Sequence, residues 1–171
     1  ELTKLALENN KNVFVEKPMA QTFEDCNHLM ELAENRRLKL STEYTYTFSK
    51  ALRKAQCLVE EGAIGVLEGM QILIKQMGRF LPYDITTLLG SHALSILDMF
   101  FPLDGCSFTL HPIQMTEKLN TGVIITFVSE SSNFRGTIDI TSHCPVREKR
   151  VIIYGEKGTI IYDPMKEDCL Q

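Results

Sequence analysis

The 171-residue sequence contains no tryptophan, no long apolar run and no cluster of basic residues. A membrane-spanning helix needs about 20 mostly apolar residues, and no stretch approaches that length, so we expect no contact with a membrane. Lysine and arginine number 18 against 22 acidic residues, and this net charge of −4 argues against a nucleic-acid partner. Since 44% of the residues are hydrophobic, the chain can form a buried core and is not expected to be disordered.

Several signature motifs are also missing. The sequence has no GxSxG, no GxxxxGK[ST] and no glycine-rich dinucleotide-binding loop. The four histidines lie apart, without the spacing of zinc ligands, so we expect no metal site. Five widely spaced cysteines without a CxxC pair favour free thiols in a reducing compartment. The absence of an Asn-x-Ser/Thr sequon fits the same expectation, which is a cytoplasmic protein.

Residues 1–42 alternate between helix and strand patterns. A short helix precedes the apolar run at 13–15, which is typical of a strand buried on both faces of a parallel sheet. Thr22 and Asp25 resemble a capping box that opens a second helix. The apolar residues of that helix, which we expect to face a core, are Phe23, Leu29, Met30 and Ala33. A second strand follows near 38–41, and this order is the rhythm of a doubly wound sheet.

The rest of the chain is rich in strand patterns. Helices are predicted over 48–61, ended by Gly62, and over 90–101, ended by Pro102. The predicted strands are 66–76, 123–128, 136–140, 150–154 and 159–162. Short connections between most of these strands predict a largely antiparallel sheet, and the last two are expected to form a hairpin.

The first candidate functional site is Glu16-Lys17-Pro18, at the end of the predicted parallel strand. Proline favours an extended conformation for the residue before it. Lys17 would therefore project from the carboxyl end of a strand, where open α/β sheets bind ligands. A lysine at that place can donate to a substrate hydroxyl or a cofactor ribose. The alternative is a solvated charge pair before a turn.

The second candidate is His92, which follows Gly90 and Ser91 at the expected start of a helix. In the first turn of a helix the dipole disfavours the protonated imidazole, which leaves a neutral ring able to accept a proton. The alternative is a first-turn residue that bonds locally.

Four stretches of the sequence, in order, resemble the glucose–fructose oxidoreductase/inositol dehydrogenase/MocA family. Residues 11–40 carry the Glu-Lys-Pro motif, and 48–72 carry the next helix and the first strand of the sheet domain. Residues 90–100 resemble the helix of the family's active-site histidine, and 151–163 resemble a late hairpin. Since the order holds over nearly the whole chain, the resemblance is more specific than any single motif.

The resemblance implies an NAD(P)-dependent oxidoreductase with a small hydroxylated or carbonyl substrate of the sugar or polyol type. It implies a Rossmann domain, of which residues 1–42 are the carboxy-terminal remnant, and an open-sheet domain at residues 43–171, truncated at its C-terminus. The expected fold class is therefore α/β plus α+β, a doubly wound remnant followed by an open, mostly antiparallel sheet with helices on one face. A homo-oligomer formed through the open sheet is also implied.

The resemblance assigns roles by position. Lys17 would contact both the nicotinamide ribose and the reacting hydroxyl, and Glu16 and Pro18 would shape the same edge of the cofactor pocket. The Lys17–Pro18 peptide is often cis in this family. His92 would accept or donate a proton while hydride moves to or from NAD or NADP.

The sequence departs from the family pattern at several places. Leu88 stands where members often carry an aspartate, and Ser95 where a second acidic residue is frequent. Asp84 is the candidate replacement, at a different spacing, for binding substrate. Many members have an arginine near Tyr46, which is a candidate either to bond substrate or to pack at the domain seam.

The missing GxGxxG leaves three hypotheses open. In the first, the chain is the carboxy-terminal portion of an oxidoreductase, inactive alone because the pyrophosphate lacks its helix N-terminus. In the second, it belongs to a cofactor-sensing regulator of the same fold without catalysis. In the third, it is a self-association module.

Overall fold

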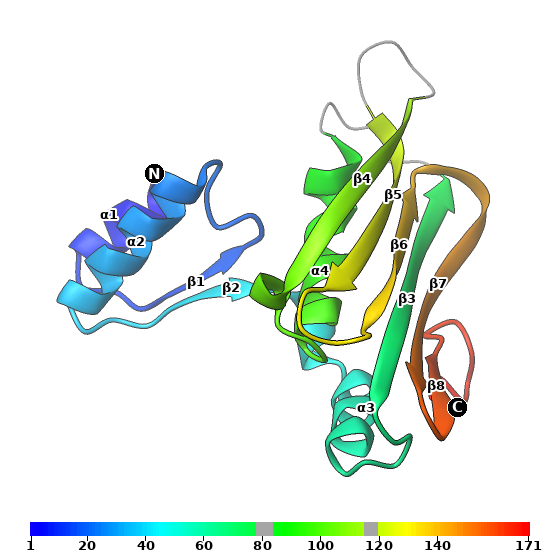
Figure 1. Ribbon diagram of the computed structural model, residues 1–171. Coiled ribbons are helices and arrows are strands. Elements are labelled where there is room, and N and C mark those ends of the chain that lie inside the picture. The colour runs from blue at the N-terminus through cyan, green and yellow to red at the C-terminus, as the bar shows by residue number, and fades with distance from the viewer. Residues whose placement is uncertain (78–83, 115–119) are drawn as a thin grey trace. The chain divides into compact units, whose positions relative to one another are not determined.

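The computed structural model describes residues 1–77, 84–114 and 120–171 (Figure 1). They form two compact units, Glu1–Thr45 and Tyr46–Gln171. Each unit has its own hydrophobic core. None of the helices in the described ranges combines the length and the apolar character of a membrane-spanning segment.

The first unit consists of two parallel strands and two helices. Its elements are α1 (Leu2–Glu8), β1 (Val13–Glu16), α2 (Phe23–Asn35) and β2 (Leu40–Glu43). β1 and β2 pair in parallel, with Val13 opposite Leu40. α2 starts as predicted, because the Oγ1 atom of Thr22 accepts a hydrogen bond from the Asp25 amide at 3.1 Å. This strand–helix–strand arrangement is the α/β part of the expected fold.

The core of the first unit lies on one face of the two strands. It is made of Leu7, Leu29 and Ala33 from the helices, with Val13 from β1 packed against them. The prediction that the run at 13–15 is buried on both faces is wrong. Side chains alternate along a strand, and Phe14, which points away from this core, is 63% exposed.

The buried side of α2 is narrower than predicted. Leu29 and Ala33, one helical turn apart, are buried. Phe23 and Met30 were expected to face the core as well, but they are 75% and 49% exposed. The helix packs on the core along a single stripe, and these two side chains lie beside it rather than on it.

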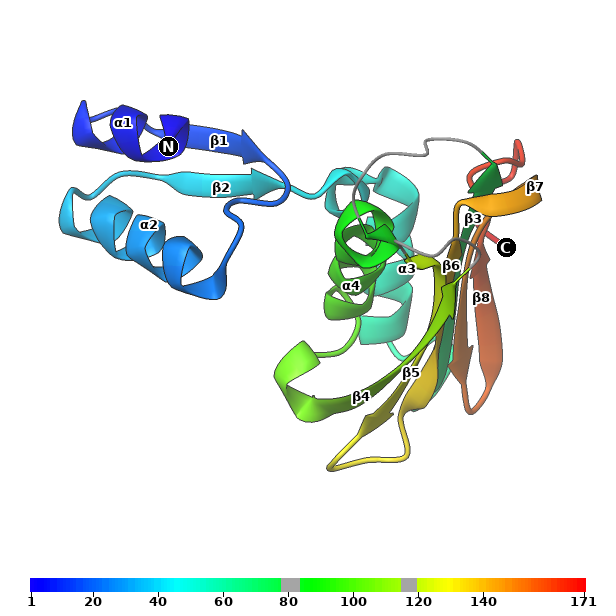
Figure 2. The ribbon, with the colours of Figure 1, turned by 90° about the horizontal axis from the view of Figure 1, so that it is seen from above.

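The second unit is built around a six-stranded sheet. From Thr45 onward the elements are η1 (Thr45–Phe48), α3 (Lys50–Glu60), β3 (Leu67–Met77), η2 (Thr86–Gly90), α4 (Ser91–Asp98), η3 (Leu103–Gly105), β4 (Cys106–Gln114), β5 (Asn120–Ser129), β6 (Arg135–Thr141), β7 (His143–Gly155) and β8 (Gly158–Tyr162). The strand order is β4-β5-β6-β3-β7-β8. β3 and β6 are parallel, and the other neighbouring pairs are antiparallel. Figures 1 and 2 show α3 and α4 on one face of the sheet. The expected fold class is confirmed.

The two faces of the sheet differ in character. On the face that the helices cover, every second residue of the central strands is buried, as in Met70, Ile72 and Ile74 of β3. The other face, which we name the open face, carries Gln71, Leu73 and Lys75 of β3, Thr137 and Asp139 of β6, and Arg150, Ile152 and Tyr154 of β7. The helix-covered face therefore holds the core of this unit.

Two glycines allow the parallel pair β3 and β6 to come close together. A Cβ atom on Gly69 would lie 2.5 Å from the carbonyl oxygen of Arg135. A Cβ atom on Gly136 would overlap the carbonyl oxygen of Met70 and lie 2.5 Å from the ring of Phe127. Only a residue without a Cβ atom fits at these positions.

All five strands predicted for the second unit are present, as β3, β5, β6, β7 and β8, and the helix predicted at 48–61 is α3. The sequence patterns missed β4 and the first half of β7. β4 pairs with β5 alone and lies at the edge of the sheet, where Pro112 is tolerated. That proline and the polar alternation around it hide the strand in the sequence.

Candidate active site

The Glu16-Lys17-Pro18 motif lies at the carboxyl end of the parallel pair. Glu16 is the last residue of β1 and stands opposite Glu43, the last residue of β2. The Lys17–Pro18 peptide bond is cis. Lys17 is half-buried, whereas Glu16 and Pro18 are exposed. The lysine thus occupies the edge of the sheet at which α/β folds bind ligands.

His92 lies inside a continuous helical segment rather than at its start. A π-helical turn, η2, precedes α4 directly, and Gly90 at the junction has helical φ and ψ angles of −60° and −40°. His92 lies in the first turn of α4, as predicted, but the π-helical turn in front of it continues the helical backbone, so the argument from the helix dipole does not apply. Single π turns inside α-helices are frequent at functional sites, and sequence patterns gave no sign of this one.

Asp84 caps this helical segment. Its Oδ1 atom accepts hydrogen bonds from the Thr86 amide at 2.9 Å and from the Thr86 hydroxyl at 2.6 Å. The Asp84 carbonyl oxygen also accepts from the amide of Leu88 at 3.1 Å. The structure therefore gives the Asp84 carboxylate the role of a helix cap.

Three half-buried side chains meet on the helix-covered face of the sheet, and we name them the His92 cluster. They are Tyr46 of η1, His92 of α4 and Lys149 of β7. The rings of Tyr46 and His92 meet edge to face, with their centroids 5.5 Å apart. The Nζ atom of Lys149 lies 5.7 Å from the centroid of the Tyr46 ring, within the range of a cation–π contact. The structure thus places Tyr46 in contact with His92.

Lys149 is the member of the His92 cluster that sequence reasoning missed. It stands opposite Ile74 of β3 and two residues before Val151, and both of these are buried. A lysine in register with buried aliphatic residues is an identifiable signal of a polar site. Lys149 was not identified from the sequence because the strand was predicted to begin at residue 150, whereas β7 begins at His143.

Tyr162 lies next to the cluster and joins β8 to the start of α3. Burial raises the pKa of its phenol, and a hydrogen bond with Ser49 acts in the opposite direction. Ser49 also caps α3, since its Oγ atom accepts from the Leu52 amide at 3.4 Å. The start of α3 and the strand β8 are therefore linked beside the His92 cluster, through Ser49 and Tyr162.

The open face carries a network of charges. The Lys75 Nζ atom donates to Asp139 Oδ2 at 2.7 Å, and this hydrogen bond raises the pKa of Lys75 although burial opposes it. The guanidinium of Arg150 lies 3.5 Å from a carboxylate oxygen of Glu148 and 3.6 Å from one of Asp163. The cations of this network are thus matched by carboxylates.

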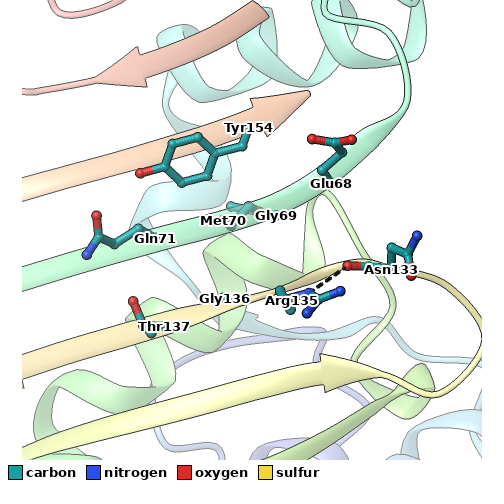
Figure 3. A pocket seen from close by; sticks show the side chains of 9 residues that line it. All are labelled: Glu68, Gly69, Met70, Gln71, Asn133, Arg135, Gly136, Thr137 and Tyr154. Carbon is teal, nitrogen blue, oxygen red and sulfur yellow. Dashed lines mark hydrogen bonds between the residues drawn. The ribbon is translucent and has the colours of Figure 1, made fainter. Parts of the chain in front are cut away.

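A hollow of about 550 Å³ lies at one end of the open face (Figure 3). Its lining residues are Glu68, Gly69, Met70, Gln71, Asn133, Arg135, Gly136, Thr137 and Tyr154. Nε of Arg135 donates to the carbonyl oxygen of Asn133 at 3.2 Å, the one dashed contact in the figure. None of the site residues predicted from the sequence lines this hollow, and the His92 cluster occupies the opposite face.

The cysteines and the possible metal ligands were the remaining candidates for a reactive site. All five cysteines are free. Burial raises the pKa of the Cys106 thiol, and the carboxylates of Glu130 and Asp104 raise it further. Within the described ranges, no three His, Cys, Asp or Glu side chains are placed to hold a metal ion.

Comparison with known proteins gives a consistent result. Residues 1–44 match the GFO/IDH/MocA oxidoreductase family with an NAD-binding Rossmann fold. No curated protein matches the chain. An oxidoreductase from Pseudomonas syringae is similar in structure, with a TM-score of 0.85 and 16% identity, over 99% of this chain and 48% of that one. An inositol dehydrogenase homolog from Azotobacter vinelandii, solved with NAD+, has a TM-score of 0.85 and 14% identity, over 99% of this chain and 50% of its own.

The chain thus spans about half the length of the structures that it matches. At these identities the structural likeness shows the fold. The family match covers the segment that contains Glu16, Lys17 and Pro18.

Proposed function

We propose, from the confirmed resemblance of this chain to the GFO/IDH/MocA oxidoreductase family, that it forms the carboxy-terminal portion of an NAD(P)-dependent oxidoreductase. The reaction would transfer a hydride to or from a small hydroxylated or carbonyl substrate of the sugar or polyol type. The observation that carries the proposal is the family match over residues 1–44, a segment in which Lys17 directly follows the parallel strand β1. The fold of the second unit supports it.

The residues at the end of β1 and directly after it have the chemistry to hold the ribose end of a nicotinamide cofactor. Lys17 is half-buried beside the exposed carboxylate of Glu16, so a donor and an acceptor for hydroxyl groups lie together at one strand end. When bound, the nicotinamide accepts or supplies the hydride. Lys17 would hold the cofactor ribose and the oxygen of the reacting carbon through its ammonium donors. Pro18 would shape the same edge of the cofactor pocket.

His92 would carry the proton. When an alcohol is oxidised, the carbon gives up a hydride and the hydroxyl gives up a proton. The imidazole of His92 would accept that proton, and in the reverse direction it would return it to the carbonyl oxygen. Tyr46, in edge contact with the imidazole, limits the positions the ring can adopt and offers a hydroxyl to a substrate.

Tight cofactor binding would need a pyrophosphate site that this chain does not supply. The 171 residues contain no glycine-rich dinucleotide loop, and such loops place the pyrophosphate at a helix N-terminus. We expect the chain alone to be inactive and to bind NADH more weakly than micromolar. Micromolar or tighter binding in a fluorescence titration of this chain would contradict the expectation.

Turnover in the whole protein tests the proposal. A panel of small polyols, sugars and sugar acids is assayed at 340 nm with NAD and with NADP. Lys17→Met and His92→Ala are expected to reduce turnover at least about 100-fold, since a positioned acid–base group contributes 10²–10⁴-fold. Lys157→Met, at an exposed position in the β7–β8 turn, is the matched control and is expected to keep the wild-type rate.

Leu88 supports a second candidate, a cofactor sensor without catalysis. It lies four residues before His92, on the same side of the helical segment, at the position where the family often has an acidic residue. An apolar side chain there cannot orient the imidazole through a hydrogen bond. Binding of NAD(H) by the whole protein without turnover of any substrate in the panel would favour the sensor.

The open face supports a further proposal, self-association. Ile124 and Val128 of β5 are exposed on it, and half-buried Leu73 and Ile152 lie on β3 and β7, on the other side of β6. Exposed apolar side chains on the uncovered face of a sheet are typical of a surface that pairs with another copy. We expect a homo-oligomer formed through this face, and a strict monomer at high concentration in gel filtration would contradict it.

A further inference from the structure

Lys149 occupies an unusual place for a cation. Its neighbours on the helix-covered face, Ile74 across the strand pair and Val151 along β7, are 3% and 2% exposed. Its own side chain is half-buried. Removing a charge from water is costly unless the charge is matched by an opposite charge or by hydrogen bonds. A lysine at this register position therefore calls for a specific partner.

The described part of the chain does not give Lys149 a carboxylate partner. Its neighbours in sequence, Glu148 and Arg150, lie in the charge network of the open face, together with Lys75. The contact that Lys149 makes is with the ring of Tyr46, 5.7 Å from its centroid. A cation–π contact holds the ammonium in place but uses none of its N–H donors for a hydrogen bond to oxygen.

The position of Lys149 relative to His92 indicates what the partner is. One aromatic ring, Tyr46, contacts both the ammonium of Lys149 and the imidazole of His92. A small molecule whose hydroxyl group lies at His92 would extend past the edge of this ring toward Lys149. An anionic group at that end of the molecule would meet an ammonium whose N–H donors no described residue uses, in a partly desolvated site where a charge-assisted hydrogen bond is strong.

We propose that Lys149 recognises a carboxylate on the substrate, and that the substrate class is therefore hydroxylated carboxylic acids, such as sugar acids, rather than neutral polyols. This inference rests on the proposed function, because it takes His92 as the residue that faces the reacting hydroxyl. Lys149 is a specificity-determining residue, and Tyr46 positions its ammonium.

The test compares pairs of compounds that differ in the carboxylate alone, D-glucuronate with D-glucose and D-gluconate with D-glucitol, in the whole protein saturated with NAD(P). The wild type is expected to favour the acid of each pair in kcat/KM. Lys149→Met is expected to raise KM for the acid by about 10- to 100-fold, the range for a charge-assisted hydrogen bond, and to leave the neutral compound unchanged. Lys149→Arg, which keeps the charge, is expected to restore most of the preference.

Lys166→Met is the matched control, since it removes one positive charge from an exposed lysine. It is expected to leave the acid preference unchanged. A wild type that uses the neutral compounds as well as the acids would overturn the proposal. So would a Lys149→Met variant that weakens both members of a pair equally.

Binding without turnover separates this inference from the proposed function. The acids are titrated into the same proteins while the imidazole resonances are followed by NMR. A saturable shift of the His92 signal that Lys149→Met abolishes supports carboxylate recognition even if no compound is turned over, which would refute the oxidoreductase instead. Turnover of acids with a KM that Lys149→Met does not change would refute carboxylate recognition and leave the oxidoreductase standing.

Discussion

Replacing Asp84 by alanine removes the cap of the helical segment that carries His92. Two hydrogen bonds are lost, from the Thr86 amide at 2.9 Å and from the Thr86 hydroxyl at 2.6 Å. Loss of a helix N-cap costs about 0.5–2 kcal/mol, and loss of a negative charge at a helix N-terminus costs about 0.3–1 kcal/mol. We expect the free energy of unfolding to fall by about 1–2 kcal/mol, which lowers Tm by roughly 3–8 °C in a chain of this size.

Thermal unfolding followed by near-UV circular dichroism measures this effect. The signal reports on the second unit, because every tyrosine except Tyr44 belongs to it. Asp84→Asn is the matched control, since the amide oxygen can still accept both hydrogen bonds and asparagine is as good an N-cap as aspartate. The Asp84→Asn protein is expected to retain most of the stability that Asp84→Ala loses. An Asp84→Ala protein that melts at the wild-type temperature would refute the capping role, and a KM changed by Asp84→Asn would show a direct contact with substrate.

Three further predictions concern the sheet and its titratable groups. The pKa of Lys75 is raised by a hydrogen bond to a carboxylate and that of Tyr162 by burial, so the stability they provide is complete below about pH 10 and is lost as the pH rises through their folded-state values. Urea unfolding between pH 9 and 12 should show this loss, and Tyr162→Phe should lessen it. Burial raises the pKa of the Cys106 thiol, so Cys106 should react with iodoacetamide more slowly than exposed Cys57. Peptide mass spectrometry measures both rates, and equal rates would contradict this prediction. Gly136→Ala should cost more than about 2 kcal/mol in a urea titration, because the methyl group overlaps the neighbouring strand.

Local sequence patterns were sufficient to predict most of the helices and strands of the second unit. The aliphatic runs at 66–76 and 123–128 are β3 and β5, since a strand that pairs on both sides needs β-branched residues along its length. Gly62, predicted to end a helix, has a φ of +73°, which glycine adopts without strain. In these places the local preference and the final fold agree.

The remainder depends on contacts between distant segments. The first half of β7 is a strand because β3 is long enough to pair with it, although Pro145 and a run of charged residues disfavour a strand locally. The π turn before His92 likewise has no sequence pattern of its own. The exposure of Phe14 follows from how many elements cover the two strands of the first unit, which a local pattern does not report.

The residues of the candidate site divide in the same way between local patterns and distant contacts. Lys17, His92 and Tyr46 could be named because each belongs to a local motif or a family resemblance. Lys149 could not, because its role depends on register with Ile74 of another strand. Asp84 was named for binding substrate, and its side chain was found in a helix cap.

The most direct test of the central claim is the effect of His92→Ala on hydride transfer in the whole protein. We predict that kcat falls at least about 100-fold while the Kd for NAD(P)H stays within about twofold, because the imidazole handles the proton and not the cofactor. A His92→Ala enzyme that transfers hydride at the wild-type rate would contradict the account.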